Sequence, residues 1–121
     1  MEERAHRKLD VWKRAMGLTK MVYEITANFP KEEYYSLVMQ MRRAAISVPS
    51  NLAEGAARSG KKEFLQFINI AQGSLSELDT QIELARMLHY LKEDGYLKLQ
   101  KEIQVISKQL YGLSRAVRVR K

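Results

Sequence analysis

The chain has 121 residues, of which 45% are hydrophobic and 29% charged, a composition typical of one globular domain and unlike that of a disordered chain. It contains no cysteine, which excludes disulfides, thiolate metal sites and a cysteine nucleophile. Its net charge of +7 favours a polyanionic partner, with simple solubility as the alternative. The first ten residues are charged and no apolar run is long enough to span a bilayer, so we expect a cytoplasmic protein.

The first predicted helix covers about residues 10–28, with Asp10 as N-cap and Pro30 just beyond its end. Two apolar stripes run along it side by side, which is wider than the seam that one bundle core needs. The outer stripe contains residue types that are enriched at interfaces, namely Trp12, Met16 and Tyr23. We therefore predict that this stripe contacts another copy of the chain. The alternative is a helix that is more buried in its own bundle.

The second predicted helix covers about residues 32–58, with a core stripe that begins at Leu37. Pro49 lies inside it and cannot donate to the carbonyl of Ala45, which predicts a kink. Ser47, Ser50 or a water could satisfy that carbonyl. Many small residues in this helix and the next predict a closely packed seam between them.

The third and fourth predicted helices cover about residues 61–90 and 94–118, after a break at Ser59-Gly60. Short loops make consecutive helices antiparallel neighbours, so we expect an all-α, up-down four-helix bundle formed by residues 1–121 as one domain. Polar residues on the second and third helices are expected to form a structural network, with acid–base work by paired carboxylates as the less favoured alternative. These residues are Arg43, Asn51, Glu54, Ser74 and Glu77.

Most of the excess positive charge lies near the end of the chain. From Lys98 onward the sequence has seven basic residues and one acidic residue, Glu102. We expect residues 115–121 to form a basic tail that frays from Arg118 onward. A second basic cluster follows the second helix. Together they supply the predicted nucleic-acid contacts: Lys101, Lys108, Arg115, Arg118, Arg120, Lys121, Arg58, Lys61 and Lys62. No interleaving of aromatic and basic residues typical of single-strand binding is evident in the sequence.

Catalytic and metal motifs are not recognised in the sequence. The run from Gly55 to Lys62 nearly matches a phosphate-binding loop, but Lys62 replaces the hydroxyl residue that holds magnesium, and a helix precedes the loop. The histidines, His6 and His89, lack the Glu-x-x-His spacing of di-iron bundles. We therefore expect no catalytic residues, no metal and no cofactor, and a protein that is not an enzyme.

Several motifs resemble those of the four-helix-bundle proteins encoded in intervening sequences of bacterial 23S ribosomal RNA. The most specific is QMRRAAISVPSNLAEG at residues 40–55. Further matches are LDVW at 9–12, FPKEE at 29–33, EFLQF at 63–67 and IAQGSLSELDTQ at 70–81. The similarity spans residues 9–113. Gly60 and Lys92 depart from it, because members commonly have a serine cap there.

The resemblance implies a homopentamer around a central channel, and no catalytic residues to carry over. The family is also similar in fold to accessory variability proteins of diversity-generating retroelements, which are basic pentamers that bind nucleic acid and a reverse transcriptase. The sequence therefore leads to two hypotheses. The first is a non-catalytic oligomeric adaptor that binds nucleic acid, as RNA or an RNA–protein complex. The alternative is a protein-only scaffold that docks a partner such as a reverse transcriptase.

Overall fold

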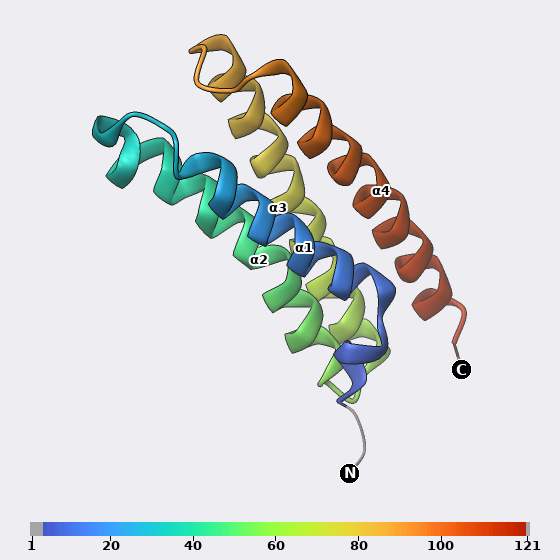
Figure 1. The fold of residues 1–121 in the computed structure, drawn as a ribbon. Coiled ribbons are helices and arrows are strands. Elements are labelled where there is room, and N and C mark those ends of the chain that lie inside the picture. Colours follow the sequence, from blue (N-terminus) through green and yellow to red (C-terminus); the bar gives the residue numbers. More distant parts are fainter. Residues whose placement is uncertain (1–3, 121) are drawn as a thin grey trace.

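The computed structural model describes residues 4–120, and within them the protein is all-helical, without strands. Four long helices lie side by side, as Figure 1 shows. They are α1 (Asp10–Thr26), α2 (Met39–Ala56), α3 (Lys61–Met87) and α4 (Glu93–Arg118). Short 3-10 turns cover Ala5–Lys8 and Lys31–Glu33, and a π-helical turn covers Tyr34–Val38. The prediction of an all-α chain with four helices is confirmed.

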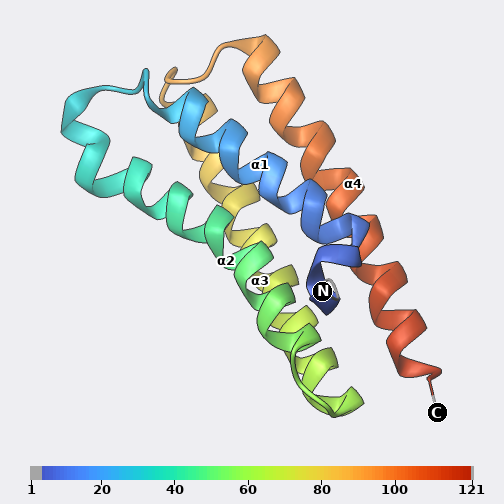
Figure 2. The ribbon, with the colours of Figure 1, turned by 60° about the horizontal axis from the view of Figure 1, so that its bottom comes forward.

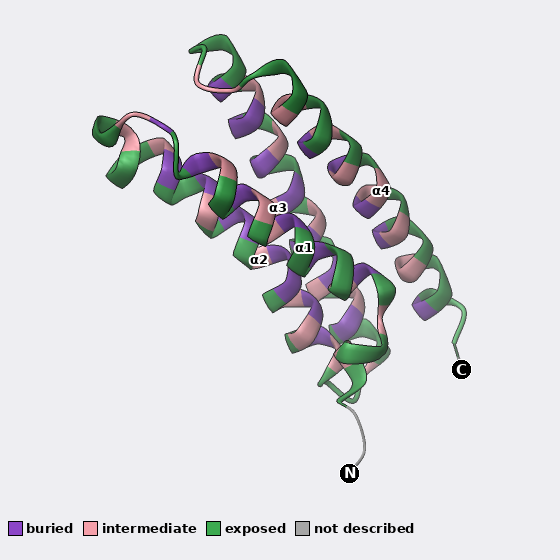
Figure 3. Ribbon diagram, viewed as in Figure 1, coloured by how far each residue is buried: buried purple, intermediate pink, exposed green. Residues whose placement is uncertain are grey.

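One hydrophobic core lies between the four helices. Each helix packs against the next in the chain, and α1 also packs against α4, so that the four helices enclose the core. The view in Figure 2 shows α4 alongside α1 and α3, and Figure 3 shows that the buried residues face inward. The largest fully buried side chains come from every helix and include Leu18, Met41, Leu52, Leu78 and Ile106.

The start of the second helix differs from the prediction. The α-helical segment begins at Met39, and the π turn before it carries an extra residue per hydrogen-bonded ring. The extra residue changes the register, so that Val38 is buried, whereas Leu37, the predicted first core residue, is only half-buried. The N-cap of the first helix also differs from the prediction. Leu9 holds the N-cap position of α1, and Asp10, the predicted N-cap, is the first helical residue.

Pro49 lies inside α2 and is buried. The carbonyl of Ala45, which proline leaves without its helical donor, accepts a hydrogen bond from the hydroxyl of Thr19 in α1 at 3.1 Å. The expected partners, Ser47 and Ser50, do not fill this role. The hydroxyl of Thr19 also lies 2.9 Å from the carbonyl of Ala15 in its own helix. A threonine on the neighbouring helix therefore satisfies the defect in α2.

Replacing Thr19 with valine should destabilise the protein, because the carbonyl of Ala45 would lose its donor in a partly buried position. We expect a loss of about 1–2 kcal/mol in the free energy of unfolding, measured by urea denaturation. Thr19→Ser keeps the hydroxyl and serves as the matched control. A loss from Thr19→Ser with none from Thr19→Val, which keeps a methyl group, would show that the methyl group, and not the hydrogen bond, stabilises this contact.

The seam between α2 and α3 is close, as the small residues indicate. A Cβ atom added at Gly55 would lie 2.7 Å from Cβ of Phe67 and 3.0 Å from Cδ1 of Phe64. These distances leave no room for a side chain, so Gly55 is the residue that allows α2 to reach α3 at this point. At the other end of α3, His89 has a φ of 63°, a left-handed conformation that often ends a helix.

Candidate nucleic-acid interface

The two basic clusters of the sequence meet at one end of the bundle, where α3 begins and α4 ends. The ammonium of Lys61 donates to the carbonyl oxygens of Arg118 at 3.0 Å and Arg120 at 2.9 Å. The guanidinium of Arg120 lies 5.5 Å from the centre of the Phe64 ring. In the structure α4 extends to Arg118, and these contacts join α3 to the segment expected to fray as far as Arg120; Lys121 lies outside the described residues.

Some of the predicted phosphate-binding side chains already have partners within the chain. Arg58 pairs with Glu54 at 3.0 Å, lies 3.9 Å from Glu63 and is placed over the ring of Phe67. The ammonium of Lys61 is engaged by the two carbonyls at the end of α4. Arg58 and Lys61 therefore organise this end of the bundle and are less suited to a phosphate than their sequence positions indicate.

Three basic residues of the C-terminal cluster form an exposed line along α4. Lys101, Lys108 and Arg115 follow one another at intervals of seven residues, which places them on one helix face about 10 Å apart, and all three are exposed. We call this line the α4 basic stripe.

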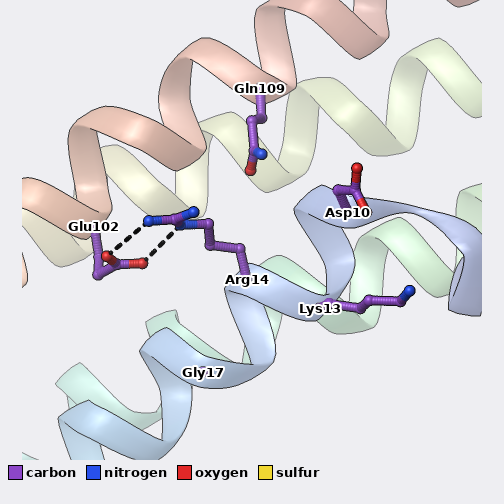
Figure 4. A pocket seen from close by; sticks show the side chains of 6 residues that line it. All are labelled: Asp10, Lys13, Arg14, Gly17, Glu102 and Gln109. Carbon is purple, nitrogen blue, oxygen red and sulfur yellow. Dashed lines mark hydrogen bonds and ion pairs between the residues drawn. The ribbon is translucent and has the colours of Figure 1, made fainter.

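Glu102 is the one acidic residue from Lys98 onward. Its negative charge does not offset the positive charge of the α4 basic stripe, because its side chain points to α1. Figure 4 shows the carboxylate paired with the guanidinium of Arg14, with Nε–Oε1 at 3.0 Å and Nη2–Oε2 at 3.3 Å. The two side chains line a cleft of about 500 Å³ between α1 and α4, together with Asp10, Lys13, Gly17 and Gln109. Its mixed charges make this cleft a poor site for a polyanion.

Beside the stripe, α3 and α4 enclose a groove of about 510 Å³. We call it the α3/α4 groove, and its lining includes Lys62, Gln66, Asn69, Gln72, Tyr111 and Arg118. Among the described residues that line it, none is acidic. Lys62 and Arg118 bring the two basic clusters of the sequence to one surface, and the guanidinium of Arg118 donates to the hydroxyl of Ser114 at 3.1 Å. An anion would therefore meet a field of one sign here.

The predicted polar network is only partly assembled within the chain. The hydroxyls of Ser47 and Ser74 lie 2.7 Å apart across the α2–α3 seam, and the amide of Asn51 donates to the hydroxyl of Ser47 at 2.9 Å. Arg43, Glu54 and Glu77 are exposed and do not join this cluster. Ser47, which was not among the predicted members, is the residue that links Asn51 to Ser74.

The predicted contact residues on α1 lie on one outer face. Met16 and Tyr23 are 47% and 40% exposed, whereas Trp12 is half-buried and stacks edge-on against His6 at 4.9 Å. The neighbouring helix α2 presents Met39 and Ile46, each 41% exposed. Arg42 connects the two helices, with its guanidinium 4.4 Å from the centre of the Tyr23 ring. We call Trp12, Met16, Tyr23, Met39 and Ile46 the α1/α2 outer face.

The carboxyl and phenol groups with shifted pKa values lie at the opposite end of the bundle. Hydrogen bonds from Ser36 and Tyr90 lower the pKa of Glu33. Accepting carboxylates raise the pKa of two tyrosines, Glu33 that of Tyr90 and Glu83 that of Tyr96. These shifts favour the ordinary neutral-pH states, a charged carboxylate and neutral phenols. Among residues 4–120, no cluster of acidic residues and histidines is arranged to hold a metal ion.

The geometry defines an all-helical bundle with a basic edge, and none of the helices within residues 4–120 has the length and apolarity to cross a membrane. The model of the 23S rRNA-intervening sequence protein family matches residues 7–112. The chain belongs to this family.

A solved structure has the same fold. It is a protein of unknown function of the S23 ribosomal protein family from Bacteroides thetaiotaomicron. The TM-score is 0.79 at 18% identity, with 87% of this chain and 95% of that chain covered. At this identity the likeness shows the fold alone. No curated protein is significantly similar to the chain.

Proposed function

We propose that the chain is a non-catalytic oligomeric adaptor that binds nucleic acid, as RNA or an RNA–protein complex, in the cytoplasm. The observation that carries this proposal is the juxtaposition of the α4 basic stripe with the α3/α4 groove. Lys62 and Arg118 extend the positive surface from α4 across to α3. The carboxylate of Glu102 is paired with Arg14 of α1 and does not neutralise this surface. Phosphates would meet these side chains with little dependence on base sequence.

The proposal includes assembly of antiparallel up-down bundles, bent at Pro49, into a homopentamer. The α1/α2 outer face supports it, since partly exposed Met, Tyr and Ile side chains on neighbouring helices are typical of a contact surface. Five copies of a chain with a net charge of +7 would carry about +35 on one particle. Several identical basic edges would then engage one polyanion at once and raise its affinity.

The dependence of affinity on salt tests the nucleic-acid proposal. We expect log K to fall linearly with log salt concentration, with about 0.7 unit of slope per phosphate neutralised on a single strand. The double substitution Lys108→Gln and Arg115→Gln should reduce the slope by about 1.4 for each chain in contact. These substitutions are preferable to removing residues 115–121, since that deletion would also remove the buried side chain of Val117.

The measurement is fluorescence anisotropy of a labelled RNA oligonucleotide across a salt series. Lys20→Gln removes an exposed charge from α1, outside the stripe, and is the matched control. If Lys20→Gln lowers the salt slope as much as the double substitution does, the phosphate contacts lie outside the α4 basic stripe. Wild-type protein that binds no RNA at low salt would overturn the proposed function.

The alternative function, a scaffold for a protein partner such as a reverse transcriptase, is favoured by one observation. The same exposed apolar residues of the α1/α2 outer face would suit a protein partner. Apolar contacts persist at salt concentrations that release nucleic acid. Partner capture from nuclease-treated extract at high salt, combined with no RNA binding at low salt, would favour this alternative.

A further inference from the structure

We propose that the α3/α4 groove receives an unpaired base of a single-stranded nucleic acid, which stacks on Tyr111 while Lys62 and Arg118 bind the flanking phosphates. This inference rests on the proposed function and specifies the form of nucleic acid that the basic surface selects. The combination of an aromatic ring with basic side chains in the groove contrasts with the linear sequence, in which aromatic and basic residues do not visibly interleave.

The position of Tyr111 is the first reason for this inference. Its side chain lines the groove and is 62% exposed, so much of it is accessible to a ligand. Arg118 lies seven residues further along α4, on the same helix face and about 10 Å away. Lys62 reaches the groove from α3. The alternation of aromatic and basic groups that single-strand binding requires is therefore built across two helices.

The second reason is the set of side-chain amides in the groove, from Gln66, Asn69 and Gln72. Gln72 also lines an adjoining pocket of about 110 Å³, which it shares with Asp79 and Tyr111. Within residues 4–120, the buried amide nitrogen of Gln72 has no hydrogen-bond partner. A base edge offers carbonyl and ring-nitrogen acceptors that could satisfy such a donor. A double helix cannot use this site, because its bases are stacked on one another.

The other pockets of the bundle are less suited to this ligand. The pocket of about 470 Å³ between α1 and the start of α4 has mixed charges, because Glu24 and Asp94 line it together with Lys92 and Lys98. The pocket of about 230 Å³ at the start of α2 contains tyrosines and arginines, but Arg42 is already stacked on Tyr23 there. The lining of the α3/α4 groove combines an exposed ring, side-chain amides and basic side chains without a carboxylate. Asp79 lines the adjoining pocket, where its carboxylate accepts a hydrogen bond from the amide of Gln100 at 2.8 Å.

The test compares a single-stranded RNA of about ten nucleotides with the duplex of the same sequence, by anisotropy at one fixed salt concentration. Tyr111→Ala should weaken single-strand binding roughly tenfold, which corresponds to about 1.4 kcal/mol, and leave duplex binding unchanged. Tyr111→Phe keeps the ring and should bind like the wild type. Tyr35→Ala removes an exposed tyrosine at the other end of the bundle and should also have no effect.

The outcomes separate this inference from the proposed function. If the wild type binds both RNAs and Tyr111→Ala binds them as well as the wild type does, the stacking site is wrong and the adaptor function stands. A salt slope that is unchanged in Tyr111→Ala, but smaller in a Lys62→Gln, Arg118→Gln variant, would assign the ring and the charges the separate roles proposed. A wild type that binds neither RNA overturns both proposals.

Discussion

Ile46→Glu should convert the proposed pentamer to single chains. Ile46 belongs to the α1/α2 outer face and is 41% exposed, so a glutamate should be tolerated by the folded monomer. Within an assembled interface the same carboxylate would be buried without a partner, at a cost of several kcal/mol. The expected mass falls from about 70 kDa for five copies to 14.1 kDa for one, measured by light scattering.

The affinity of Ile46→Glu for a long RNA should also fall, by roughly 100-fold or more, because separate chains lose the multivalent contact. Leu97→Glu is the matched control, since Leu97 is an exposed leucine on α4 that does not belong to the α1/α2 outer face. Circular dichroism should show that both variants keep their helices. A variant Ile46→Glu that keeps the wild-type mass, or a control that dissociates equally, would remove this face from the interface.

Gly55→Ala should destabilise the fold by about 1–3 kcal/mol, because the new methyl group would push α2 away from Phe67. At roughly 4 °C for each kcal/mol, the melting temperature falls by about 4 to 12 °C. Thermal unfolding followed by circular dichroism measures the change, at one protein concentration for all variants. The effect is large because Cβ of Phe67 is fixed to its backbone and cannot rotate aside.

The matched control for this prediction is Gly17→Ala in α1. A Cβ added at Gly17 meets nothing within 4 Å, so alanine should stabilise that helix by about 0.5–1 kcal/mol. The two substitutions make the same chemical change in a helix and are expected to have opposite signs. Two stabilised variants would mean that α2 and α3 do not approach each other as closely as the structure shows.

The helices could be predicted from the sequence because their apolar pattern continues over many turns. Each long helix was located to within a few residues at its ends, apart from the start of α2. There the π turn at Tyr34–Val38 adds one residue without interrupting the apolar sequence, so periodicity alone cannot detect it. The shift from Leu37 to Val38 as the buried residue follows from that turn.

The contacts that shape the candidate site could not be predicted, because they join residues far apart in the chain. Nothing in the local sequence pairs Thr19 with the carbonyl of Ala45, or Glu102 with Arg14. The basic residues were identified by their type, but which of them have internal partners depends on the packing of α3 on α4. Tyr111 was missed although Arg118 follows it on the same helix face, because the groove also needs Lys62 and the amides of α3, which only the packing of the two helices brings to it.

The contact of Lys61 with the end of α4 has a consequence for the thermodynamics of binding. The last turn of a helix ordinarily fluctuates, and a ligand that immobilises it must offset the lost conformational entropy. Here the ammonium already holds the carbonyls of Arg118 and Arg120. The backbone at Arg118 and Arg120 therefore has a partner on α3 before any phosphate arrives, and more of the interaction energy is left for affinity.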